Sequence, residues 1–135
     1  MIFQEKDFTL DLKEKINSIE IALYKLIEIL LDEYKPTFAK KGLEFNAEFD
    51  RIGRNPFQPG YTSSISIGIS DDEKEELTHL HTIKIWECER YFLGVPISKK
   101  IPGSKVTGEL LDETYEDIEL ELKAFIVEQL TINEG

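Results

Sequence analysis

The sequence is poor in cysteine and contains no long uninterrupted apolar segment. Its 135 residues include one cysteine, Cys88, which excludes an internal disulfide and fits a reducing compartment. No apolar run approaches the roughly 20 residues that a helix needs to cross a membrane. Residues 1–7 have neither the basic start nor the apolar run of a secretory signal. We therefore expect a cytoplasmic protein that makes no contact with a membrane.

The chain also lacks the composition of a disordered polypeptide. Apolar residues make up 41% of it and aromatic residues 10%, which is enough to form a hydrophobic core. Domains most often contain about 100–150 residues. We therefore expect residues 1–135 to form a single domain.

Basic residues are scarce in two segments, which together carry the whole net charge of −11. Residues 71–76 contain five acids and one lysine, and residues 109–121 contain seven acids and no base. Such surfaces repel nucleic acid, because phosphate binding needs a basic footprint. They attract basic proteins and raise the rate of association with them. We therefore expect no direct nucleic-acid binding and a basic protein as the partner.

The strongest periodicity in the sequence lies in residues 12–34. Apolar side chains recur there at alternating spacings of four and three, which places them on one side of an α-helix. The apolar arc is broad enough to need a sheet on one side and a second helix on the other. A helix that pairs two copies of the chain is the alternative, so a homodimer stays open. Pro36 is expected to kink or restart the helix, and Gly42 is expected to end it.

Three segments are expected to form strands. Residues 43–50 and 61–70 alternate between apolar and polar side chains, which is typical of half-buried strands. A third strand is expected over about 79–92. Within it the apolar parity changes between Ile85 and Trp86, which indicates a β-bulge or burial on both faces.

The last segment, residues 113–130, has a second helical stripe with Asp112 or Thr114 as its cap. The order of these elements predicts an α+β fold. In it a three- to four-stranded antiparallel meander carries the N- and C-terminal helices on one face.

His79 and His81 are the pair with the spacing of metal ligands. On a strand both rings point to the same side, but the sequence nominates no third ligand to converge on an ion. We expect no metal, no cofactor and no catalytic residue, because Cys88 also has no partner histidine at recognisable spacing. A small metal-dependent enzyme that uses the two histidines is the alternative.

Two surfaces have the composition of a protein-binding site. On the outer side of the last helix, an apolar strip that includes Leu120 lies among acids, as in a binding hot spot. On the outer face of the sheet, acids alternate with hydroxyl residues. Scattered exposed apolar residues and a solvated sheet face are the plainer alternatives. The expected partner-binding residues are Asp71, Asp72, Glu73, Glu75, Glu76, Asp112, Glu113, Glu116, Asp117, Leu120, Glu44 and Glu48.

In overall character the chain resembles the immunity proteins of bacterial toxin–immunity pairs, including those of contact-dependent growth inhibition. The resemblance rests on the acidic segments 71–76 and 109–121 and on the helix–sheet–helix order; it includes no motif that would assign a residue. It implies a non-enzymatic inhibitor that neutralises a basic toxin domain, expected to be a nuclease, by masking its active or substrate-binding surface. A nucleic-acid-mimicking inhibitor of a DNA-binding enzyme is the alternative among binding proteins.

Overall fold

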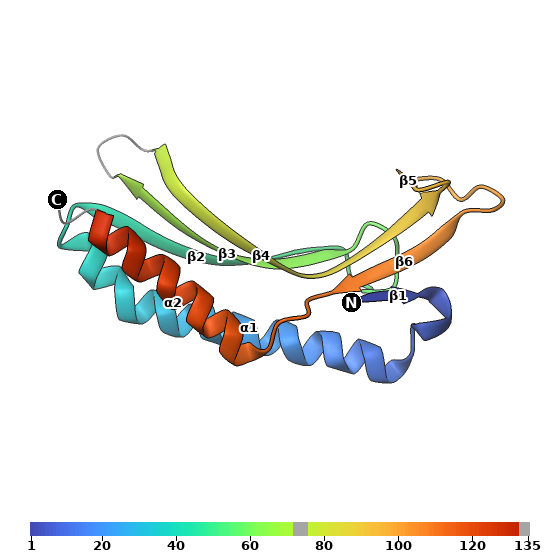
Figure 1. The fold of residues 1–135 in the computed structure, drawn as a ribbon, viewed down its shortest axis with the longest axis horizontal. Helices are drawn as coiled ribbons and strands as arrows, with labels where there is room; N and C mark the ends of the chain where they lie inside the picture. The colour runs from blue at the N-terminus through green and yellow to red at the C-terminus, as the bar shows by residue number, and fades with distance from the viewer. Residues whose placement is uncertain (72–75, 133–135) are drawn as a thin grey trace. The chain divides into compact units, whose positions relative to one another are not determined.

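The structure, a computed structural model, describes residues 1–71 and 76–132, with side chains except at residues 76–78. Two helices and an antiparallel sheet of six strands give an α+β fold (Figure 1). The elements are β1 (Ile2–Gln4), a 3-10 turn (Glu5–Asp7), α1 (Leu10–Ala39), β2 (Leu43–Ile52), β3 (Thr62–Asp71), β4 (Glu76–Phe92), β5 (Val95–Ile97), β6 (Lys105–Leu110) and α2 (Tyr115–Ile132). In the described part of the chain, neither helix is long and apolar enough to cross a membrane.

The sheet has the strand order β1-β6-β4-β3-β2, and β5 pairs with β4 outside this path. The predicted α+β class is therefore confirmed, whereas the prediction of three to four strands is wrong. The strands beyond the three long ones are short: β1 and β5 have three residues each, and β6 has six. In β6, Gly108 occupies a buried position. An alternating strand pattern would have a large apolar side chain there.

The contacts of the chain group into two units, each built from three segments. The first unit comprises Met1–Ile21, Asp50–Ser64 and Lys84–Asp112, and the second comprises Ala22–Phe49, Ile65–Ile83 and Glu113–Gly135. Helix α1 and strands β2, β3 and β4 each contribute residues to both units. The expectation of a single domain stays a prediction.

The core of the first unit is centred on the Trp86 indole, which is fully buried. Its Nε1 donates a hydrogen bond to the carbonyl oxygen of Pro56 at 2.6 Å, and the rings of Phe8 and Phe57 pack edge-on against it. A Cβ added to Gly108 on β6 would lie 2.0 Å from the indole carbon Cη2. The indole therefore requires glycine at this position.

The second unit buries aliphatic side chains from its strands and from both helices. Leu26 and Leu30 of α1, Ile67 of β3 and Leu122 and Ile126 of α2 are all fully or almost fully buried. Within this unit, α2 and the C-terminal half of α1 lie on the same side of β2, β3 and β4 (Figure 1). The core of this unit is thus a helical layer packed on one face of the sheet.

Aromatic contacts show which helix packs on which strand of the second unit. Phe38 of α1 stacks on Phe45 of β2, with ring centroids 5.2 Å apart. Phe125 of α2 stacks on His81 of β4, with centroids 5.1 Å apart. Helix α1 therefore covers β2, and helix α2 covers β4.

Strand β4 changes its inward-facing side at two consecutive residues. Ile85 and Trp86 are both fully buried, and Cys88 continues the parity of Trp86. The predicted change of parity is therefore confirmed. One consequence is that Lys84 and Glu87, which are three residues apart, meet on the same face in a hydrogen-bonded ion pair.

The ends of α1 follow the predicted chemistry only in part. The helix continues through Pro36 to Ala39, so the proline does not restart it. Gly42 has a left-handed φ of 75°, and its amide donates to the carbonyl of Ala39 at 3.0 Å. The predicted glycine terminus is therefore confirmed.

Candidate functional site

The outward face of α2 carries an exposed apolar strip. Leu120, Ala124 and Val127 are spaced by four and three residues, so they lie on one side of the helix. The side chains of Leu120 and Val127 are 68% and 53% exposed, whereas Leu122 and Ile126 on the opposite side are buried. The side chains of the strip therefore do not belong to the core of the second unit.

Carboxylates border this strip without basic partners. Glu113, Glu116 and Glu128 are exposed, and none lies within ion-pair distance of a base among the described residues. The one base on the helix, Lys123, has its Nζ 3.7 Å from Oε1 of Glu119. We define the outward face of α2 as the apolar strip with Glu116 and Glu128 of the helix and Glu113, which lies two residues before it. This surface combines exposed apolar side chains with acids that have no basic partner among the described residues.

Two expected partner-binding acids have structural roles near the start of α2. The hydroxyl of Thr114 accepts from the Asp117 amide at 3.2 Å, and the Asp117 carboxylate accepts from the Thr114 amide at 3.4 Å. This reciprocal pair is a capping box, and it confirms Thr114 as the predicted cap. Asp112 lies 2.8 Å from the amino group of Met1. Charge reversal at Asp117 would therefore disturb the helix as well as its surface.

The expected acids of the sheet lie on a different face from those of α2. Glu44 and Glu48 are exposed on β2, while Phe45 between them is fully buried and packs on Phe38 of α1. Since side chains alternate along a strand, the two acids point away from the helices. The predicted residues therefore form two separate surfaces.

The first acidic segment is described only at its ends. Asp71 is the last residue of β3 and is half-exposed, and Glu76 is the first residue of β4. Asp72, Glu73 and Glu75 lie outside the described residues, as does the side chain of Glu76. Their expected role in binding stays a prediction.

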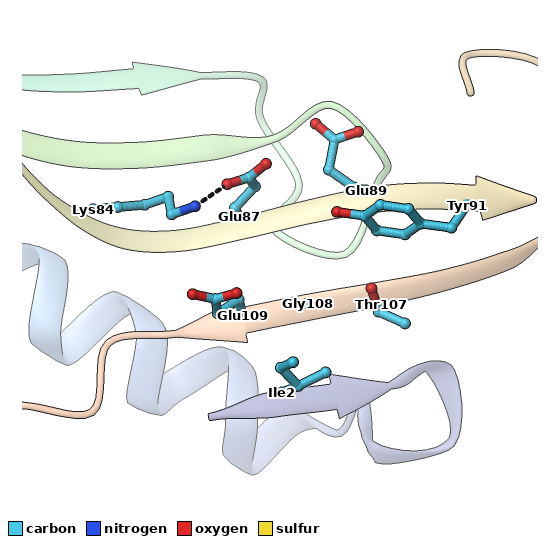
Figure 2. A pocket seen from close by; sticks show the side chains of 8 residues that line it. All are labelled: Ile2, Lys84, Glu87, Glu89, Tyr91, Thr107, Gly108 and Glu109. Carbon is cyan, nitrogen blue, oxygen red and sulfur yellow. Dashed lines mark hydrogen bonds and ion pairs between the residues drawn. The ribbon is translucent and has the colours of Figure 1, made fainter. Parts of the chain in front are cut away.

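A pocket of about 210 Å³ lies on the sheet of the first unit (Figure 2). Strands β4, β6 and β1, which pair antiparallel in this order, contribute its lining residues. They are Lys84, Glu87, Glu89 and Tyr91 of β4, Thr107, Gly108 and Glu109 of β6, and Ile2 of β1.

One cation offsets part of the negative charge in this pocket, which has three acids, Glu87, Glu89 and Glu109, and one base, Lys84. Glu87 and Glu109 are directly opposite on β4 and β6, an arrangement that is destabilising for like charges. The hydrogen bond from Lys84 to Glu87 raises the pKa of Lys84, burial lowers it by less, and the charges of Glu87 and Glu109 raise it further. The pocket is therefore an acidic cluster with a built-in cation.

Sequence reasoning missed this pocket although one signal pointed to it. In the sequence nothing marks Glu87 as a site residue, and Glu109 stands out only as part of the acidic segment 109–121. The change of parity at Trp86 places Lys84 and Glu87 on one face. The position of Glu109 depends on the pairing of β6 with β4, which no local pattern indicates.

His81 is fixed by its neighbours in the second unit. Its ring stacks on Phe125, and its Nε2 lies 3.2 Å from Oε2 of Glu121 on α2. Across residues 1–71 and 76–132, no three His, Cys, Asp or Glu side chains are grouped so that they would hold a metal ion. The metal-enzyme alternative with His79 therefore finds no third ligand in that part of the chain.

Two reactive groups of the first unit are buried in structural roles. Burial raises the pKa of Cys88 to about 11, and the charges of Glu89 and Glu5 act in the same direction. Its sulfur is therefore a thiol at neutral pH, a poor nucleophile. The hydroxyl of Tyr61 donates to the Glu20 carboxylate at 2.6 Å; burial first, and then this hydrogen bond, raises the pKa of Tyr61 well above its usual range.

Comparisons with known proteins assign no family to this chain. A scan against protein-family models finds no match, and searches of the curated proteins and of the solved structures find none either.

Proposed function

We propose that this protein is a non-enzymatic inhibitor that binds a basic toxin domain, a nuclease in our proposal, and masks its active or substrate-binding surface. The observation that carries the proposal is the outward face of α2. There, Leu120 and Val127 are exposed in one strip, and the bordering acids have no basic partner within the described residues. An apolar anchor with charges around it is the usual composition of a binding hot spot.

The chemistry of this face selects a cationic partner. Hydrogen bonds between carboxylates and arginine or lysine are shorter and stronger than neutral ones. The net charge of −11 adds long-range attraction that speeds the encounter and weakens with salt. A basic nuclease domain offers such a surface where it binds phosphates, so that occupying it also blocks the substrate.

The internal arrangement of reactive groups favours inhibition over catalysis. Cys88 is buried as a thiol, and the Nε2 of His81 faces Glu121. The apolar strip also argues for the toxin inhibitor over the nucleic-acid mimic, because it interrupts the carboxylates of α2, whereas phosphates follow one another continuously along a strand. An inhibitor of this class would act in the cytoplasm, before the toxin reaches nucleic acid.

The proposal is tested by searching the genes next to that of this chain for an exported protein with a basic toxin domain and by coexpressing that domain with this chain. We expect the wild-type chain to restore growth and to inhibit the purified domain stoichiometrically. The variant E113K/E116K/E128K should associate more slowly with the domain, with a smaller salt dependence, and lose most of the inhibition. It spares Asp117, whose carboxylate caps α2.

The matched control is E14K/D32K/E33K, which makes the same change in net charge at exposed positions of α1. It should retain inhibition if the α2 face is the binding site. An equal loss of inhibition in both variants would show that only net charge matters, and it would exclude the α2 face as the binding site. A partner that is neutral or acidic, and whose binding neither variant changes, would contradict the proposal as a whole.

A further inference from the structure

Strand β2 lies at one end of the sheet. It is the last member of the order β1-β6-β4-β3-β2, and among the described residues no strand pairs with its other edge. It is ten residues long and contains neither proline nor glycine. Long, regular edges of this kind are usually shortened, bulged or covered in natural proteins. The free edge of β2 is therefore open to pairing with another strand.

Side chains of β2 give its two faces different character. In the second unit, the outward face carries Glu44, Asn46 and Glu48, all exposed. The inward face carries Phe45, which packs on α1, and Phe49, whose ring lies edge-on to Tyr24 with centroids 5.9 Å apart. A strand added to this edge would continue both faces, since side chains alternate with the same period.

Helix α1 offers a surface for the inward side chains of such a strand. Tyr24 and Leu31 are seven residues apart and so lie on one side of the helix. Tyr24 is 47% exposed although it contacts Phe49 of β2, and Leu31 is half-buried. Helix α1 thus leaves aromatic and apolar surface uncovered at Tyr24, which contacts β2, and at Leu31 on the same side of the helix.

We propose that the edge of β2 binds an extended segment of the partner by strand addition. The segment has lysine or arginine on the side that continues Glu44 and Glu48, and apolar residues on the side that faces Tyr24 and Leu31. Strand addition would be a second, backbone-mediated contact with the partner that binds the outward face of α2. The inference rests on the proposed function, because that function supplies the positive charge of the partner. Main-chain hydrogen bonds supply affinity in this mode, and alternate side chains supply specificity.

Charge makes a second copy of this chain a poor occupant. If β2 paired with another β2, the outward faces would place Glu44 and Glu48 next to the same residues of the copy. Like charges across a strand pair are destabilising, whereas opposite charges stabilise the pair. The acidic outward face therefore selects a basic strand.

The test uses a capped synthetic peptide of alternating lysine and valine as the probe, with the ¹⁵N-labelled full chain observed by NMR. We expect the peptide to shift the amides of residues 43–49 and to bind about tenfold more tightly than its glutamate–valine counterpart, because two charge pairs change sign. The variant E44K/E48K should reverse this preference. The variant E113K/E116K/E128K should leave peptide binding at β2 unchanged.

Other outcomes would overturn the inference. Equal binding of a lysine–valine peptide with N-methylated backbone amides would exclude strand addition. Shifts that map to α2, or no binding at all, would exclude the β2 edge, and concentration-dependent shifts of residues 43–49 without peptide would identify a second copy as the occupant. Toxin inhibition measured in parallel separates the two proposals, since it persists if the β2 edge alone is wrong.

Discussion

The core of the first unit is centred on one indole, whereas that of the second combines aliphatic side chains from strands and helices with the stacked rings of Phe38 and Phe45. In the first unit, the Trp86 ring leaves room only for glycine at position 108, and its Nε1 donates to the carbonyl of Pro56. The Tyr61 hydroxyl donates to the carboxylate of Glu20, a residue that is 4% exposed. The buried Ile67 of the second unit has no polar group to satisfy. The first core therefore depends on individual close contacts and hydrogen bonds. The second core depends mainly on the apolar area that it buries.

The largest expected effect is that of Gly108→Ala in the first unit. The new methyl group would lie 2.0 Å from the Trp86 ring, so the indole or β6 must move. Overpacking of a well-filled core costs about 3 kcal/mol, and we expect a loss of at least that size in the free energy of unfolding measured with urea. The double variant G108A/W86F should recover part of the loss, because the smaller ring leaves room. Unchanged stability of G108A would contradict the specificity of the first core.

Tyr61→Phe should have the next largest effect. It leaves the buried Glu20 carboxylate without its donor, at a cost of about 2 kcal/mol, while Tyr115→Phe at a partly exposed position should be neutral. Because the pKa of Tyr61 is raised in the folded state, the folded chain holds this proton more tightly. Its stabilising effect is then complete below the ordinary tyrosine pKa of about 10 and declines at higher pH. Urea melts at increasing pH should show a steeper decline for wild type than for Y61F.

Ile67→Val in the second unit should have the smallest effect of the three. Removing one methylene from a fully buried side chain costs about 1 kcal/mol, since the neighbouring aliphatic chains relax around the space. The same urea melts measure it, and Ser66→Ala, next to it on the half-exposed face of β3, is the control. A loss as large as that of G108A would remove the contrast between the two cores.

Local periodicity predicts much of this fold. The stripe of residues 12–34, the alternation of 43–50 and the parity change at Trp86 all follow from side-chain chemistry that neighbours in sequence share. The structure bears these out in α1, β2 and β4. Spacing also predicts the exposed positions of Glu116 and Leu120 on α2, whereas Glu128 is not among the residues expected from the sequence.

The remainder depends on contacts between residues far apart in the chain. Strand β6 stays hidden because Gly108 is explained only by the Trp86 ring above it. The pocket requires Glu109 to lie opposite Glu87, and the free edge of β2 follows from the order of all strands. None of these features has a repeat or spacing that marks it in the sequence.

Cys88 is the one cysteine of the chain, and it lies in the first unit. Cys88 is fully buried, and its backbone is bonded on both sides, to Gly60 and to Tyr61. A thiol-modifying reagent can react with it only when that unit opens, since its protonated form is also unreactive at neutral pH. The rate of thiol labelling of the wild-type protein would therefore report how often the first unit opens. No engineered probe is needed, because the chain has no second cysteine.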